Sequence, residues 1–200
     1  MHTPSEHAGP AAIVDRTDPP RGLLNTAWPL AALALLLLML VRACVPAAPP
    51  AASPPAFDAT AAARQANDAA LGALRALPPQ PGLPQALAAL NGVVINFATG
   101  SDAVPNDMTA LLGQAAAVIA ALPAATRIVI TGHTDNIGDA GANLALSQRR
   151  AAAVRAALID QGAPPEALST QGVGDSRPVA GNDSEAGRFR NRRIEFDAAP

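Results

Sequence analysis

Residues 127–151 read RIVITGHTDNIGDAGANLALSQRRA, and the organisation of the chain is best read outward from this stretch. It begins with the β-branched run 128–130, which predicts a strand. A polar, glycine-spaced loop follows and leads to Asn143, where an alanine-rich helix is predicted to begin. A strand, a loop and a helix start in this order bring polar side chains and free backbone N–H groups to one end of a sheet.

Two charged residues in this stretch, Asp135 and Arg150, are the strongest candidate site residues. Helical spacing places Arg150 in one row with the apolar residues Leu146, Val154 and Leu158. Arg149 is rotated by about 100° from that row. A guanidinium in an apolar row needs a partner, and Asp135 is the obvious anion. Either the two form a structural ion pair that closes the loop, or they bind the ammonium and carboxylate of an amino-acid head.

The composition excludes several classes of function. The net charge of −2 gives no electrostatic footprint for nucleic acid. All 14 basic residues are arginines, which excludes a P-loop lysine and a Schiff-base lysine. His133 and Asp135 have no further histidine or cysteine nearby, so no metal site is expected. Ser147 lacks the exposed turn of a hydrolase nucleophile. We therefore expect no catalytic residue, no metal and no cofactor.

The N-terminal part of the chain predicts a membrane attachment. Residues 1–26 are polar and without periodicity, which indicates a disordered cytoplasmic tail. Residues 27–45 form the only strongly apolar run and predict a transmembrane anchor, with Arg42 reaching towards the interface. Alternatively, residues 41–44 resemble a lipoprotein cleavage box, and Cys44 would carry the lipid. The anchor is favoured, because the tail is long and acidic for a signal peptide.

Residues 46–90 predict a Pro/Ala-rich linker that contains a helix at about 57–77. Whether this helix forms a stalk or packs on the domain stays open. Residues 91–200 form the predicted domain, with strands at 93–97, 127–131, 167–172 and 191–197 and helices at about 106–122 and 143–161. The order β-α-β-α-β-β predicts an α/β fold, a two-layer sandwich in which helices cover one face of a mixed sheet. Residues 173–190 are expected to be a long functional loop.

Five segments together resemble a known family. They are INF (95–97), GHTDNIG (132–138), NLALSQRRAAAV (143–154), STQGVGDSRPVAGN (169–182) and GRFRNRRIEF (187–196). In this order and spacing they resemble the C-terminal domain of the outer-membrane protein A (OmpA) family, which is shared with peptidoglycan-associated lipoprotein and flagellar motor protein B. The resemblance covers residues 93–197 and does not extend to residues 1–90.

The resemblance implies non-catalytic binding of peptidoglycan through the diaminopimelate of its stem peptide. Asp135 would take the ammonium group and Arg150 the carboxylate. The other residues that match family positions around the pocket are Asn143, Thr134, Phe97, Asn191 and Arg193. The basic cluster of Arg188, Arg190, Arg192 and Arg193 is either a solvated strand edge or an anion contact beside this site.

The expected function is to tether the membrane, or an envelope complex, to the cell wall. The expected partners are peptidoglycan, the membrane and other envelope proteins. The expected location is the inner membrane, with the C-terminal domain in the periplasm. The alternative function is that of an interaction subunit in an envelope secretion or motility complex. The sequence makes no prediction of the oligomeric state.

Overall fold

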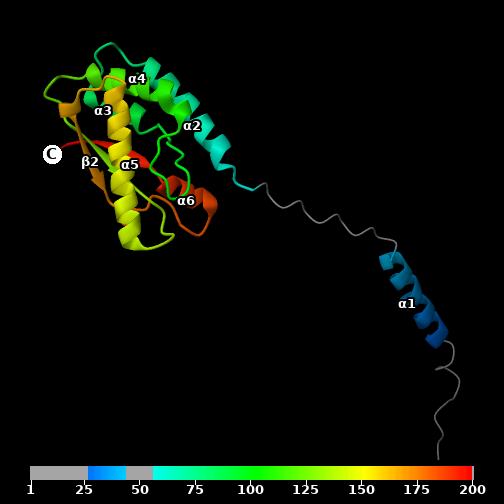
Figure 1. Cartoon of the computed structure of the whole chain (residues 1–200). Coiled ribbons are helices and arrows are strands. Elements are labelled where there is room, and N and C mark those ends of the chain that lie inside the picture. Colours follow the sequence, from blue (N-terminus) through cyan, green and yellow to red (C-terminus); the bar gives the residue numbers. More distant parts are fainter. Residues whose placement is uncertain (1–26, 44–55, 200) are drawn as a thin grey trace, which may run out of the picture. The chain divides into compact units, whose positions relative to one another are not determined.

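The computed structural model describes residues 27–43 and 56–199 (Figure 1). The chain divides into two compact units, Met1–Pro54 and Pro55–Pro200. In the first unit the described residues form helix α1 (Ala27–Ala43), where the apolar anchor is predicted. Five leucines and a methionine on α1 are more than half exposed, namely Leu33, Leu35, Leu36, Leu37, Leu38 and Met39.

A membrane span is not confirmed. Within residues 27–43 and 56–199, no helix combines the length and apolar character that crossing a bilayer requires. The predicted tail at 1–26, Cys44 and residues 46–55 of the predicted linker lie outside the described residues.

The second unit contains a three-stranded mixed sheet (Figure 1). Strand β1 (Ile128–Gly132) lies in the middle, parallel to β2 (Leu168–Gly172) and antiparallel to β3 (Ile194–Ala198). Helix α5 (Ala140–Asp160) connects β1 to β2 and packs against both strands. This crossover aligns the C-terminal ends of β1 and β2, as in other parallel β-α-β units.

Two glycines allow α5 to approach the sheet closely. A Cβ atom on Gly132 would collide with the backbone carbonyl of Ser147, and one on Gly172 would collide with the backbone nitrogen of Gln148. Any larger residue at these strand ends would push the helix away. The glycines therefore determine how near residues 147 and 148 of α5 lie to the ends of β1 and β2.

Helices α2 (Ala59–Arg75) and α3 (Leu83–Leu90) belong to the same compact unit as the sheet. Helix α2 packs against α3 and against α4 (Thr109–Ala120), and α3 packs against β3. Leu74 of α2 and Leu90 of α3 are fully buried in the shared core. The helix predicted at 57–77 is thus present and packs on the domain. The compact unit begins near residue 55 and not at residue 91.

The strand predicted at 93–97 is wrong. The alternate burial of Val93 and Ile95 resembles a strand, but this segment pairs with no strand of the sheet. The backbone of Val94 instead exchanges two hydrogen bonds with the side-chain amide of Asn67, at 2.8 and 2.9 Å. The sheet among the described residues therefore has three strands and not four.

The outer edge of β3 is paired in a similar way. The backbone N–H of Phe196 donates to Asn91 Oδ1 at 2.8 Å, and its carbonyl accepts from Asn91 Nδ2 at 3.0 Å. An asparagine amide presents an N–H donor and a carbonyl acceptor side by side, as the backbone of a paired strand residue does. Asn91 therefore takes the place of one residue of a neighbouring strand.

The predicted loop at 173–190 contains a helix, α6 (Glu185–Asn191), and the last strand begins at Ile194 and not at residue 191. The hydroxyl of Ser184 caps α6 by accepting from the backbone N–H of Gly187. The ring of Phe189 on α6 packs at 59° against the ring of Phe57, with 5.3 Å between their centroids. This pair ties α6 to the chain just ahead of α2.

The remaining helical starts differ by a few residues from the sequence prediction. Helix α5 begins at Ala140, three residues before Asn143, because Asp139 caps it by accepting from Ala142 N at 2.8 Å. Two short 3₁₀ helices, η1 (Asn106–Met108) and η2 (Pro165–Ala167), precede α4 and β2.

Candidate functional site

A pocket of about 530 Å³ lies where the loop after β1 meets α5 and α6. Segment 96–100 forms another wall of this pocket. Five of the seven predicted site residues line it, namely Phe97, Thr134, Asp135, Asn143 and Arg150. Five further residues with polar or charged side chains line it and are not among the seven predicted site residues: Asn96, Thr99, Glu185, Arg188 and Arg192.

Arg150 is buried, with 4% of its surface exposed, and its side chain is held by several contacts. Its Nε donates to the carbonyl of Ser101 at 2.9 Å, and its Nη2 donates to the carbonyl of Ala98 at 3.3 Å. Its guanidinium carbon lies 4.7 Å from the centroid of the Phe97 ring. Burial lowers the pKa of this guanidinium, and the charge of Arg192 lowers it further. The side chain is therefore oriented by neutral groups.

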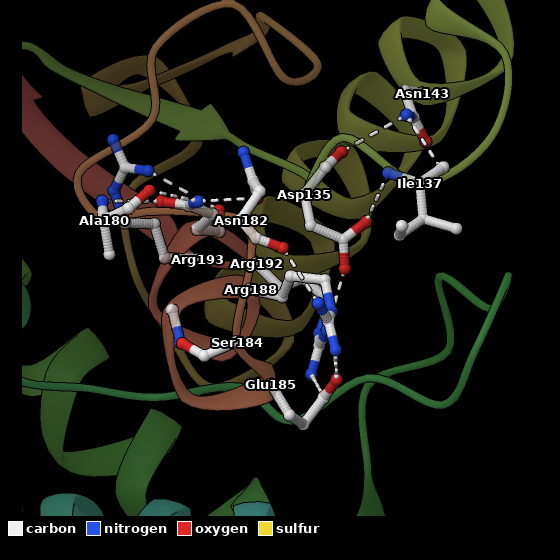
Figure 2. A network of polar contacts seen from close by, with 12 residues as sticks. Asp135, Ile137, Asn143, Ala180, Asn182, Ser184, Glu185, Arg188, Arg192 and Arg193 are labelled. Atoms are coloured by element: carbon white, nitrogen blue, oxygen red, sulfur yellow. Dashed lines mark hydrogen bonds and ion pairs between the residues drawn. The ribbon is translucent and has the colours of Figure 1, made fainter. Parts of the chain in front are cut away.

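Asp135 does not pair with Arg150, so the interpretation of these two residues as a structural ion pair is wrong. Arg192 donates from Nη1 to Asp135 Oδ2 at 2.8 Å (Figure 2). Among residues 27–43 and 56–199, Arg150 has no carboxylate within ion-pair distance (4.0 Å). A buried guanidinium without a carboxylate favours an anionic ligand.

Arg192 joins Asp135 to α6. Its Nη2 donates to Glu185 Oε1 at 2.7 Å, and the same carboxylate accepts from Arg188 at 2.9 Å (Figure 2). Burial lowers the pKa of Arg192, but its hydrogen bonds to Asp135 and Glu185 raise that pKa by more. The hydrogen bonds from Arg192 and Arg188 lower the pKa of the Glu185 carboxyl. The sequence analysis named Arg192 only as a member of the basic cluster beside the site, and spacing alone did not show that it reaches Asp135.

Asn143 shapes the loop that carries Asp135. Its Nδ2 donates to the carbonyls of Asp135 and Ile137, at 3.3 and 3.1 Å. The second oxygen of Asp135, Oδ1, accepts from the backbone N–H of Ile137 at 3.1 Å (Figure 2). The Asp135 carboxylate is thus fixed on one oxygen by the loop itself and on the other by Arg192.

Thr134 has an unused hydroxyl in the pocket wall. The residue is 4% exposed, and Oγ1 has no hydrogen-bond partner within the described part of the chain. Its backbone N–H donates to the carbonyl of Gly174 at 2.9 Å, which fixes the residue in place. A buried hydroxyl without a partner is costly, and a polar ligand would remove that cost.

Asn191 and Arg193 do not line the pocket. Asn191 is fully buried and forms hydrogen bonds with the backbone of Val179 and Ala180 and with the side chain of Asn182. It therefore holds the loop ahead of α6 in place. Arg193 pairs with Glu195 at 2.8 Å. The structure gives both residues a place in the framework around the site.

His133 and Ser147, which were considered for a metal or hydrolase site, are also part of the framework. The Ser147 hydroxyl is fully buried, donates to the carbonyl of Leu144 and accepts from Gly174 N. His133 Nε2 lies 3.0 Å from Glu195 Oε2, and burial lowers the pKa of this histidine. The nearby charge of Arg193 lowers it further.

The pocket lining carries one excess positive charge, because three arginines and two carboxylates contribute to it. Arg192 and Arg188 are neutralised by Asp135 and Glu185, whereas Arg150 is not paired with a carboxylate in the described residues. The arrangement suits a small ligand whose carboxylate pairs with Arg150. If the ligand also contacts Asp135, which is paired with Arg192, it does so through an ammonium group.

Comparisons with known proteins place this site in a family. The model of the OmpA family matches residues 96–192, which include the whole lining of the pocket. Outer membrane porin F of Pseudomonas fluorescens is 49% identical over 36% of this chain and 22% of its own length. The peptidoglycan-binding protein ArfA of Mycobacterium tuberculosis is 37% identical over 57% of this chain and 35% of its own length. The chain thus spans well under half the length of these curated relatives.

Two solved structures are also similar. The peptidoglycan-associated lipoprotein of Burkholderia pseudomallei is 34% identical, with a TM-score of 0.49, over 52% of this chain and 88% of that one. The C-terminal domain of MotB from Helicobacter pylori is 32% identical, also with a TM-score of 0.49, over 53% of this chain and 83% of that one. Through residues 96–192, this chain belongs to the OmpA family.

Proposed function

We propose that the domain binds peptidoglycan without chemical conversion, by holding the free end of a diaminopimelate residue in the pocket. The carboxylate of that end pairs with Arg150 and its ammonium group with Asp135. The observation that carries the proposal is the state of Arg150, which is buried, oriented by two carbonyls and Phe97, and not paired with a carboxylate in the described residues. Thr134 adds an unpartnered hydroxyl to the same pocket.

The family supports this proposal. Proteins of the OmpA family are non-enzymatic, and one relative is named as a peptidoglycan-binding protein. A single small pocket of this kind binds weakly, in the micromolar to millimolar range (roughly 4–8 kcal/mol). Many copies on one cell wall raise the retention by avidity. The protein thus tethers the membrane, or an envelope complex, to the cell wall.

We further propose that the N-terminal region attaches the protein to a membrane, with the domain on the periplasmic side. The exposed leucines of α1 support an apolar environment for this helix. The relatives YfiB and YiaD are named as lipoproteins, so attachment through a lipid on Cys44 is the second candidate. Labelling cells with a radioactive fatty acid decides between them: incorporation that is lost in Cys44→Ala supports the lipid, and no incorporation supports the anchor.

The binding test is co-sedimentation of residues 55–200, the compact unit, with purified cell walls. We expect the wild type to pellet with diaminopimelate-type walls and to stay in the supernatant with lysine-type walls, because lysine has the ammonium group but lacks the second carboxylate. Asp135→Asn and Arg150→Gln should both abolish pelleting. Arg149→Gln is the matched control, because Arg149 is one residue away, has a side chain that is 54% exposed and lies outside the pocket.

Equal pelleting of the wild type, Asp135→Asn and Arg150→Gln would overturn the proposal. Equal pelleting of the wild type with both kinds of wall would overturn the role of diaminopimelate alone. Circular dichroism of each variant establishes that the domain is folded.

A further inference from the structure

Arg192 occupies the carboxylate that the proposed ligand needs. Its Nη1 donates to Asp135 Oδ2 at 2.8 Å, and the other oxygen of Asp135 is bonded to the backbone of Ile137. An ammonium group that approaches Asp135 therefore meets a cation that is already in place. Because two cations cannot share one carboxylate oxygen at full strength, ligand and Arg192 compete for Asp135.

Arg192 has a second carboxylate to hold it when it leaves Asp135. Its Nη2 donates to Glu185 Oε1 at 2.7 Å, so the guanidinium bridges Asp135 and Glu185 (Figure 2). The Glu185 side chain is 46% exposed and is also fixed by Arg188 at 2.9 Å. A small movement of Arg192 would break its ion pair with Asp135 while its hydrogen bond to Glu185 remains.

Arg150 and Arg192 therefore differ in state although both line the pocket. Arg150 is held by carbonyls and a ring, and its positive charge is available to a ligand. Arg192 is held by two carboxylates, and its charge is already neutralised. A ligand carboxylate is thus drawn to Arg150, whereas a ligand ammonium group must first replace Arg192 at Asp135.

We propose that Arg192 is a specificity-determining residue that competes with the ammonium group of the ligand for Asp135, and that Glu185 is the positioning residue that retains Arg192 when the ligand is bound. This inference rests on the proposed function, because it takes Asp135 as the partner of the ammonium group. Its consequence is selectivity: a simple amine gains too little at Asp135 to displace Arg192. A ligand that also carries a carboxylate gains the contact with Arg150, and this additional binding energy allows its ammonium group to displace Arg192 from Asp135.

Three related probes separate the two contacts. Meso-diaminopimelate carries both kinds of group, pimelate carries only the carboxylates, and cadaverine carries only the amines. Isothermal titration of residues 55–200 with each probe, at low salt, measures the contacts separately. For the wild type we expect diaminopimelate to bind more tightly than pimelate, and cadaverine to bind least.

Arg192→Gln removes the competitor. It should bind diaminopimelate and cadaverine about threefold to tenfold more tightly than the wild type, as expected for loss of a partly exposed ion pair. Pimelate should bind no more tightly, because the pocket loses a positive charge. Arg192→Lys restores a cation beside Asp135 and should return the affinities to wild-type values.

Glu185→Gln should act in the opposite direction. With its retaining partner gone, Arg192 is left to Asp135 alone, and diaminopimelate should bind about twofold to fivefold more weakly. Opposite signs in the two variants distinguish competition from a merely structural role, which would weaken binding in both. Arg190→Gln is the matched control, because Arg190 is exposed, belongs to α6 and does not line the pocket.

If Arg192→Gln binds diaminopimelate and pimelate more weakly, Arg192 is a direct carboxylate ligand and the inference is overturned. Unchanged affinities in that variant overturn it as well. If the wild type itself binds none of the probes, the proposed function fails and this inference fails with it. The wild-type titration therefore separates the two failures.

Discussion

The guanidinium carbon of Arg150 lies 4.7 Å from the centroid of the Phe97 ring, and this contact determines how the arginine faces the pocket. The ring covers one face of the guanidinium, while Nε and Nη2 are engaged by the carbonyls of Ser101 and Ala98. The edge that carries Nη1 remains for a ligand. Phe97 thus has a physical role in a site where it contributes no polar group.

We expect Phe97→Leu to weaken binding to diaminopimelate-type walls while the domain stays folded. The cation–π contact of a desolvated arginine contributes about 1–2 kcal/mol, so the affinity should fall by about fivefold to thirtyfold. Titration with meso-diaminopimelate measures the loss. Unchanged affinity would show that the two carbonyls alone suffice to orient Arg150.

Gly132→Ala should destabilise the domain, because the new Cβ would collide with the backbone carbonyl of Ser147. Moving α5 away from the sheet should cost about 2–4 kcal/mol of unfolding free energy. Gly72→Ala is the matched control, since Gly72 lies within α2 and a Cβ there meets nothing within 4 Å. That control should be neutral or up to about 1 kcal/mol more stable. Urea denaturation compares the two, and equal midpoints would contradict the close helix–sheet contact.

Asn91→Ala should cost about 1–3 kcal/mol, because it leaves the N–H and carbonyl of Phe196 without these partners. Asn136→Ala provides the comparison, since Asn136 is exposed and makes no side-chain hydrogen bond among the described residues. Chemical denaturation of both variants measures the difference. A loss as small as that of the control would mean that water replaces the amide of Asn91 at no cost.

Residues 91–200, the domain predicted from the sequence, should not unfold cooperatively. They lack α2 and α3, and with them the fully buried Leu74 and Leu90. Each buried leucine contributes about 1.5–3 kcal/mol, a large part of the 5–15 kcal/mol that stabilises a typical domain. Thermal unfolding followed by circular dichroism should show a sharp transition for residues 55–200 only. A sharp transition in both would make α2 and α3 accessory elements.

Acid should weaken the domain through His133, the only histidine in residues 55–200. Burial holds the pKa of His133 below its ordinary value of 6.5, so the unfolded chain takes up the proton first as the pH falls. The stability of the neutral form is complete above pH 6.5 and is lost as the pH falls below that value towards the folded pKa. The pKa of the partner Glu195 is also lowered, although burial alone would raise it. Protonation of Glu195 therefore reduces the stability of the domain only below pH 4.5, the ordinary pKa of a glutamate.

We therefore expect the unfolding free energy of the wild type to fall between pH 7.5 and 5.5 and to stay flatter in His133→Gln. Glutamine keeps a donor for Glu195 but does not titrate. Denaturant melts at several pH values measure both slopes. Parallel slopes would show that groups other than His133 dominate this range.

The sequence predicted the central β1–α5 unit well, because its signals are local. The β-branched run and the apolar row through Arg150 both follow directly from the period of each element. In the structure Arg150 of this row is buried and lines the pocket, whereas Arg149 is exposed and lies outside it. The resemblance to the OmpA family over this region is confirmed.

The errors arose where distant residues decide the local structure. Segment 93–97 alternates like a strand, but its backbone is bonded by Asn67, which lies 27 positions from Val94. The partner of Asp135 is Arg192, 57 positions away, and no period relates them. Spacing can place residues on one face of an element, but it cannot show which side chain crosses from another element.

The ring contact between Phe57 and Phe189 has a mechanical consequence. Phe57 lies just ahead of α2, and Phe189 lies on α6, which carries Glu185 and ends one residue before Arg192. A pull on the chain ahead of Phe57 is therefore transmitted through this pair to the wall of the pocket, as well as through α2 to the core. In a protein that tethers a membrane to the cell wall, tension on the chain would act directly on the residues of the pocket, so the affinity for the wall would depend on the applied force.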